Sequence, residues 1–75
     1  MNANSNVHWT YIQRKHSVLT IEYWMSPFDC DDFEIRRVEM LGDPKARNLL
    51  GAVRRHRPWE RMCVNAVVAQ IAEDA

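Results

Sequence analysis

Residues 17–25 read SVLTIEYWM, and this stretch decides the fold. Every second residue from Leu19 to Met25 is large and apolar, so an extended chain places these side chains on one face. The content of β-branched and aromatic residues is typical of a half-buried strand. The stretch therefore predicts a β-strand with one face turned toward a core.

The residues upstream repeat this alternation. In VHWTYIQR, residues 7–14, Val7, Trp9 and Tyr11 share one face, and only the polar residues 15–17 separate the two runs. Two alternating runs joined by a short polar break predict an antiparallel β-hairpin. The polar residues 1–6, MNANSN, are expected to be a disordered leader.

The segment after the hairpin allows two interpretations. As a strand, residues 33–41 place Phe33 and Ile35 on one face and then slip by one residue at Arg36–Arg37, as at a β-bulge. As a helix, the apolar residues scatter around the wheel without forming a stripe. We favour a third strand, which extends the hairpin to a three-stranded meander.

Helical spacing begins after Gly42. Asp43 and Pro44 are typical of a helix start, and apolar residues then follow at helical intervals, namely Ala46, Leu49, Leu50 and Val53. Pro58 disfavours helical geometry at the residue before it, so the helix is expected to kink or break there.

A second apolar helical face begins at Trp59, which we expect to be a core residue. The sequence thus predicts a single α+β domain over residues 7–75, in which an N-terminal antiparallel hairpin or three-stranded meander is followed by two C-terminal helices.

Charge is divided between the two halves of the chain. The 75 residues carry ten basic and ten acidic side chains, a formal net charge of zero. Residues 1–44 nevertheless carry a net charge of −3, and residues 45–75 a net charge of +3. A dedicated DNA-binding domain usually has a clear positive excess. The balance therefore argues against DNA binding as the main role, and the asymmetry favours charge-guided docking.

Most of the basic charge lies in residues 45–61, KARNLLGAVRRHRPWER, which hold six cations and one acid. Five of the six cations are arginines, which favours bidentate contact with carboxylate or phosphate. If a kinked helix continues through Pro58, most of these arginines form one stripe. The candidate partner-binding residues of this segment are Arg47, Arg54, Arg55, Arg57 and Arg61.

Three interpretations of these arginines remain open. They dock an acidic protein surface, they follow nucleic-acid phosphates, or they are neutralised by acids of the same protein. Pairing within one chain and pairing between two copies of a symmetric dimer both satisfy the third interpretation. The acids in position for it are Asp29, Asp31, Asp32 and Glu34.

Aromatic side chains provide a second candidate surface. Tyr23 and Trp24 are adjacent on one strand and therefore face opposite sides of the sheet. One of the two is expected on the exposed face, and both are candidate partner contacts because Trp and Tyr are enriched at binding hot spots.

No catalytic or metal-binding motif is assembled in the sequence. No serine lies in a Gly-x-Ser-x-Gly turn, and the histidines and cysteines lack the spacing of a nucleophile pair or a metal site. Cys30 and Cys63 are expected to be free thiols, with a single disulfide as the alternative. We expect no enzymatic activity, no cofactor and no metal. A polar start without a long apolar run predicts a cytoplasmic protein with no membrane contact.

A short chain with segregated charge, surface aromatics and no catalytic motif resembles, in overall profile, the small accessory proteins of phages and mobile elements, including anti-CRISPR proteins. The resemblance implies a non-enzymatic protein-binding module that inhibits a host complex by occluding a surface. The alternative is a nucleic-acid-binding regulator that uses the basic helix of residues 45–61.

Overall fold

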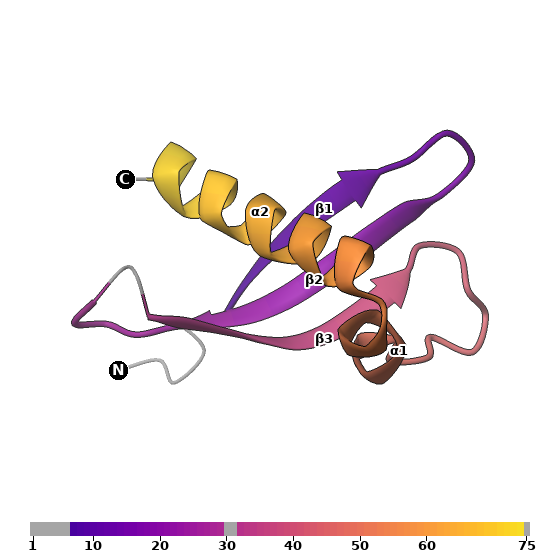
Figure 1. Cartoon of the computed structure of the whole chain (residues 1–75), viewed down its shortest axis with the longest axis horizontal. Coiled ribbons are helices and arrows are strands. Elements are labelled where there is room, and N and C mark those ends of the chain that lie inside the picture. Colours follow the sequence, from indigo (N-terminus) through magenta and orange to yellow (C-terminus); the bar gives the residue numbers. More distant parts are fainter. Residues whose placement is uncertain (1–6, 30–31, 75) are drawn as a thin grey trace.

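The computed structural model describes residues 7–29 and 32–74, so the expected leader at 1–6 and Cys30 lie outside it. The elements in chain order are strands β1 (Val7–Gln13), β2 (Val18–Met25) and β3 (Phe33–Met40) and helices α1 (Leu50–Arg55) and α2 (Arg57–Asp74). The strands form one antiparallel sheet in the order β1-β2-β3, followed by both helices (Figure 1). The predicted α+β fold is confirmed.

The predicted hairpin of β1 and β2 is confirmed, and its register decides which side chains are buried. Thr10 lies opposite Ile21, and Ile12 lies opposite Leu19. All four side chains point to the same face, because alternate residues of paired strands share a face. This face carries the core, since Leu19 and Ile21 are among its buried side chains.

The ambiguous third segment is a strand, as we favoured, over Phe33–Met40. Its pairing with β2 shifts by one residue, so that no residue of β2 is paired with Arg36. Arg36 is therefore the extra residue of a β-bulge, at the place where the sequence pattern slips. The extra residue allows Ile35 and Val38, three positions apart, both to face the core.

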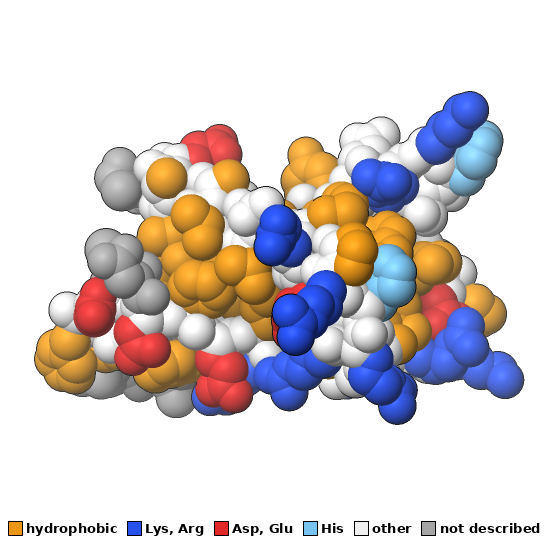
Figure 2. All heavy atoms as spheres, viewed as in Figure 1, with side chains coloured by type: hydrophobic (Ala, Val, Ile, Leu, Met, Phe, Trp, Pro, Cys, Tyr) orange, Lys and Arg blue, Asp and Glu red, His pale blue; other side chains and the backbone are white. Residues whose placement is uncertain are grey.

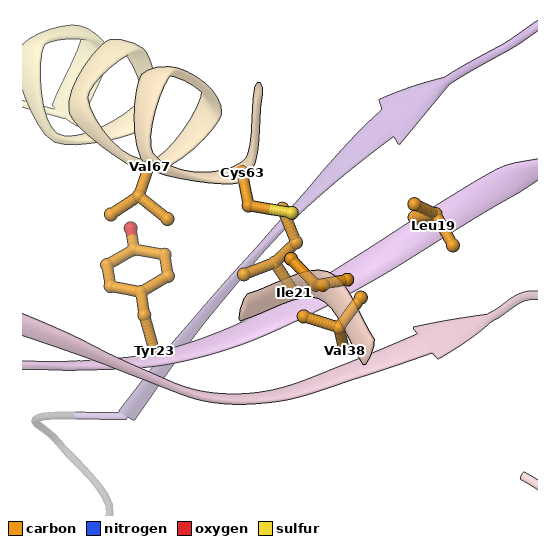
Figure 3. Close-up of a cluster of buried hydrophobic side chains, with 7 residues drawn as sticks. Leu19, Ile21, Tyr23, Val38, Cys63 and Val67 are labelled. Atoms are coloured by element: carbon orange, nitrogen blue, oxygen red, sulfur yellow. The ribbon is translucent and has the colours of Figure 1, made fainter. Parts of the chain in front are cut away.

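Both helices lie on this face of the sheet, α2 over β1 and β2 and α1 over β3 (Figure 1). Figure 2 shows apolar side chains still visible between α2 and the sheet. Figure 3 shows Val67 and Cys63 of α2 pointing toward Tyr23 and Ile21 of the sheet. The buried apolar residues are Leu19, Ile21, Tyr23, Val38, Val53, Cys63 and Val67.

Helix α1 begins later than the sequence predicts, at Leu50 rather than near Pro44. Ala46 has a φ of +48°, which lies in the left-handed region and cannot continue a right-handed helix. The Asp43 carboxylate accepts two backbone N–H groups of the residues that follow it, and this local turn competes with a helix. The predicted helix start was therefore wrong.

Residues 48–49 run along the edge of β3 instead of belonging to a helix. The Leu49 N–H donates to the Val38 carbonyl at 2.7 Å, and the Val38 N–H donates to Asn48 Oδ1 at 3.2 Å. These bonds occupy edge groups of β3 that would otherwise need water or another chain. The side chain of Leu49 still packs against the core, as its spacing indicates.

The break predicted at Pro58 is present and falls two residues upstream, at His56. His56 has an extended backbone, with φ −120° and ψ 95°, between the end of α1 and the start of α2. Pro58 lies in the first turn of α2, where a helix needs no N–H donor. Neither helix in the described part of the chain combines the length and the apolar content that a membrane span requires.

Candidate functional site

The face of the sheet opposite the helices carries a row of aromatic side chains. The register places Trp9, Tyr11 and Trp24 on this side, away from Ile21. Trp9 is 51% exposed and Tyr11 is 63% exposed, whereas Trp24 is half-buried. We call this surface the outer sheet face, and its side chains include those of Trp9, Tyr11, Thr20, Glu22, Trp24, Glu34, Arg37 and Glu39.

Trp24 is held in place by charged neighbours on β3. The guanidinium carbon of Arg36 lies 5.7 Å from the centroid of the Trp24 ring. Arg36 in turn lies 3.8 Å from the carboxylate of Glu34. A cation over an indole ring at an exposed site contributes about 0.5–1 kcal/mol. The bulge at Arg36 thus helps to position the candidate residue Trp24.

The outer sheet face is aromatic along β1 and charged along β3. Glu22 lies opposite Trp9 on one side and opposite Arg37 on the other. Arg37 forms an ion pair with Glu39 and donates a hydrogen bond to the Ala46 carbonyl at 2.7 Å. Because carboxylates stand among the cations, the face offers no continuous positive surface for a phosphate backbone.

Tyr23 is the member of the adjacent aromatic pair that faces the core. It is 1% exposed, and its ring stacks on that of His8 with 5.5 Å between the centroids. Burial, with a smaller contribution from the negative charge of Asp74, raises the pKa of Tyr23. Tyr23 was therefore wrong as a surface contact, and Trp24 is the exposed-side residue of the pair.

Three of the five candidate arginines meet where α1 passes into α2. Arg54, Arg57 and Arg61 line one hollow of about 550 Å³, together with Glu60. We call these three arginines the basic corner. The single stripe was expected only for a helix that continues through Pro58, and the helix is instead broken at His56. The three arginines nevertheless share this hollow.

The other two candidate arginines lie apart from the basic corner. Arg47 Nε lies 3.1 Å from Oδ2 of Asp43 in the loop before α1. A hydrogen bond from the Lys45 N–H, followed by the bond from the Arg47 guanidinium, lowers the pKa of Asp43. Arg55 lies in the last turn of α1, where the helix dipole favours a cation.

The basic corner has no ion-pair partner within 7–29 and 32–74. The ion pairs of these residues are Arg36–Glu34, Arg37–Glu39 and Arg47–Asp43. Asp31, one of the acids expected to neutralise the arginines, lies outside the described residues. Two of the three arginines, Arg57 and Arg61, also belong to the first turns of α2, where the helix dipole is positive. The basic corner is therefore a concentration of positive charge that no ion pair within these ranges neutralises.

An apolar groove adjoins the basic corner. It has a volume of about 240 Å³ and runs between β3 and the two helices. Arg54 lines this groove as well as the hollow of the basic corner. We call it the α2–β3 groove, and its apolar lining consists of Phe33, Ile35, Leu50, Val53, Cys63 and Val64.

Cys63 is a fully buried free thiol at the floor of this groove. Burial raises the pKa of its thiol, so the neutral form persists and the reactive thiolate is disfavoured. Across the described ranges, no group of three or more His, Cys, Asp or Glu side chains is arranged to hold a metal ion.

The expectation that Trp59 is a core residue is confirmed, because it is half-buried and packs against the core cluster. Trp9 and Tyr11, in contrast, were not predicted as contact residues. The alternation in β1 separates them from Thr10 and Ile12, but it does not say which side faces the helices. The polar residues His8 and Thr10 on the opposite side pointed the other way, because polar content favours exposure of the side that carries it.

Comparison with protein-family models, with curated proteins and with solved structures finds no match to this chain.

Proposed function

We propose that this chain is a small non-enzymatic protein-binding module that contacts its partner through the outer sheet face. The observation that carries the proposal is the exposure of Trp9 and Tyr11, 51% and 63%, on a side of the sheet that neither α1 nor α2 covers. Large aromatic side chains give wide contact areas at low entropic cost, and they dominate binding hot spots. A row of them in water is typical of an interaction surface.

The chemistry of the partner follows from the distribution of side chains on this face. Trp9 and Tyr11 lie two positions apart on β1, so their Cα atoms are about 7 Å apart. Two aromatic rings at this spacing fit a flat apolar patch on the partner. Arg37 and Glu39 on β3 supply charges of both signs for a polar rim. The basic corner lies on the helix side of the sheet, so a rigid partner cannot contact both surfaces at once.

Occlusion is the mode of action that we propose. The molecule measures 35 × 24 × 21 Å, and one face of a body this size covers about 800 Å² of a partner, the area of a standard interface. A site covered in this way is closed to other ligands, as inhibition of a host complex by a phage accessory protein requires. We place this activity in the cytoplasm, where the buried thiol of Cys63 would stay reduced.

A pair of matched double variants tests the proposal. Trp9→Thr with Tyr11→Thr removes the aromatic rings and keeps strand propensity. Phe28→Thr with Leu41→Thr is the control, because these apolar side chains are 96% and 67% exposed and lie outside the face. Each tagged chain is used to capture proteins from a nuclease-treated and an untreated host lysate, followed by mass spectrometry. We expect the unmodified chain and the control to retain the same protein, and the first variant to retain at least about tenfold less.

Three results would contradict this proposal. Equal capture by the two double variants would remove the outer sheet face from the interaction. Loss of the captured protein after nuclease treatment would favour the nucleic-acid-binding regulator, whose affinity should also fall steeply with salt. Unfolding of the Trp9 and Tyr11 variant, seen by circular dichroism, would assign these side chains to stability.

A further inference from the structure

Strand β1 lies at one edge of the sheet, and half of its backbone groups point away from β2. The Arg14 N–H donates to the Ser17 carbonyl at 2.7 Å, so the pairing of β1 with β2 begins with a backbone bond at the turn. Bonded and non-bonded pairs alternate along an antiparallel ladder, so the register bonds His8, Thr10 and Ile12 to β2. The residues between them turn their N–H and C=O groups outward, and these are Val7, Trp9, Tyr11 and Gln13.

A bond on the other side of β2 supports this alternation. The Val18 carbonyl accepts the Leu41 N–H at 2.8 Å, so Val18 turns away from Gln13, which lies opposite it on β1. Within residues 7–29 and 32–74, no hydrogen bond reaches the outward backbone groups of β1. Trp9, Tyr11 and Gln13 are exposed as well. The edge is therefore an accessible row of donors and acceptors.

The two edges of the sheet differ in how they are protected. Proteins guard edge strands with charged side chains, with bulges or with a covering segment. Strand β3 has all three, because it carries several charges, a bulge at Arg36, and bonds from residues 48–49 to Val38. The sequence of β1, VHWTYIQ, contains no Lys, Arg, Asp, Glu, Pro or Gly, and its register with β2 is unbroken. Strand β1 is thus the open edge.

We propose that the partner contributes an extended segment that pairs with β1 and continues the sheet. Outward N–H and C=O groups that recur about every 7 Å are complementary to the backbone of another extended chain. Trp9 and Tyr11 lie on this same strand, so a segment along the edge stands next to both aromatic rings. The inference rests on the proposed function, because it states how the partner of the outer sheet face is held.

The two faces of β1 define the side chains that such a segment carries. On the outer sheet face, its side chains stand beside Trp9 and Tyr11, where β-branched and aromatic residues make favourable cross-strand pairs. On the other face, α2 crosses β1 and Gln70 accepts a hydrogen bond from Thr10, so we expect small side chains there (Figure 1). Proline is excluded from the bonded positions, because it lacks the N–H donor.

The position of α2 argues against β1 of a second copy as this segment. A two-fold axis between antiparallel strands places both α2 helices on the same side of the joined sheet. The register that uses all the outward groups centres this axis on Thr10, and the two Thr10 Cα atoms are then about 4.5 Å apart. Each Thr10 is bonded to Gln70 of its own α2. The two helices would therefore lie closer than the roughly 8–10 Å that helix packing requires.

Amide exchange of the full chain, followed by NMR, tests the open edge directly. In the chain alone, the amides of Thr10 and Ile12 should be protected, and those of Trp9 and Tyr11 should exchange at least about a hundredfold faster. The probe is a synthetic peptide of alternating threonine and valine, matched in length to β1, with one lysine at each end. At about 5 mM, it should slow exchange at Trp9 and Tyr11 at least about twofold, the value at half saturation.

A matched pair of variants tests whether the partner uses this edge. Val7→Pro with Gln13→Pro removes two outward donors and keeps the rings of Trp9 and Tyr11. Val7→Thr with Gln13→Thr alters the same side chains but keeps both donors, and it is the control. Lysate capture by the proline variant should fall at least about tenfold below that of the control. The proline variant should also lose its response to the peptide.

Several results would overturn the inference. Protected Trp9 and Tyr11 amides in the chain alone would show that the edge is already covered, by a second copy if the protection rises with protein concentration. A peptide without effect, or equal capture by the two variants, would remove the edge from the interaction. Equal capture that still depends on Trp9 and Tyr11 would leave the proposed function standing, whereas no captured protein would remove both. If the proline variant unfolds by circular dichroism, Gln13→Pro is compared with Gln13→Thr instead.

Discussion

Arg14 lies over the indole ring of Trp59, with its guanidinium carbon 5.5 Å from the ring centroid. Arg14 directly follows β1, and Trp59 lies in the first turn of α2 and packs against the core. The contact therefore joins the hairpin loop to the corner between the helices. The Arg14 guanidinium covers one side of the Trp59 ring, and the other side of the ring packs against the core.

A double-mutant cycle measures this contact. Trp59→Ala is expected to lower the free energy of unfolding by about 3 kcal/mol, because it empties a partly buried position. Arg14→Ala should lower it by about 0.5 kcal/mol through loss of the cation–π contact. Urea denaturation of both single variants and the double variant should give a coupling of about 0.5 kcal/mol. Strict additivity would mean that the contact does not form in solution.

Backbone conformation in the loop before α1 predicts two changes of opposite sign. Gly42 has a φ of +90°, and Ala46 has a φ of +48°. Gly42→Ala should lower the free energy of unfolding by about 1 kcal/mol, and the cause is backbone strain alone, because no atom lies within 4 Å of the added Cβ. Ala46→Gly should raise it by about 1 kcal/mol through relief of the same strain. Thermal midpoints should move down and up by about 4–8 °C, and a stabilising Gly42→Ala would contradict the loop conformation.

The loop before α1 also shows why the start of this helix could not be predicted from the sequence. The apolar spacing correctly identified Leu49 and Val53 as core-packing residues. It placed them on a helix from Pro44, because periodicity registers burial and not the backbone bonds that compete with a helix. Besides the local turn at Asp43, non-local bonds compete with the helix: Arg37 donates to the Ala46 carbonyl at 2.7 Å, and residues 48–49 bond to Val38. No local sequence pattern contains these non-local bonds.

The candidate surfaces were predictable to a similar extent. Alternation showed that Tyr23 and Trp24 face opposite sides. The arginine spacing predicted a stripe on one continuous helix, whereas Arg54, Arg57 and Arg61 share a hollow across the break at His56. Which side of the sheet the helices would cover was not contained in either pattern. Only the folded chain separates Trp9 and Tyr11, on the outer sheet face, from the basic corner on the helix side.

Burial of Cys63 predicts a loss of stability at alkaline pH. Burial raises the pKa of this thiol in the folded chain, so between the unfolded and folded values the folded state holds a proton that the unfolded state has released. The resulting stability is complete below about pH 8.5 and falls as the pH rises past it. Cys63→Ala should flatten the dependence of the unfolding midpoint on pH between about 8 and 10.

Two controls isolate this thiol. Cys30→Ala should leave the slope unchanged if Cys63 is the cause. Tyr23→Phe should alter only the part above about pH 10, since the pKa of Tyr23 is also raised by burial but from a higher ordinary value. A slope that persists in Cys63→Ala would assign the alkaline loss of stability to another group.

The attachment of α2 to the sheet depends in part on one buried hydroxyl. Thr10 Oγ1 donates to Gln70 Oε1 at 3.3 Å, and it is the sole hydrogen bond between side chains of a strand and a helix within the described ranges. Thr10→Val keeps the shape and the strand propensity but leaves the Gln70 oxygen without its donor, so the free energy of unfolding should fall by about 1 kcal/mol.

Thr20→Val is the matched control, because Thr20 lies on the outer sheet face and its contact with the Glu39 carbonyl is long, at 3.4 Å. Its effect should stay within about 0.5 kcal/mol of zero. Amide exchange should quicken in α2 for the first variant and not for the second. Equal effects in both would show that α2 is held by apolar packing alone.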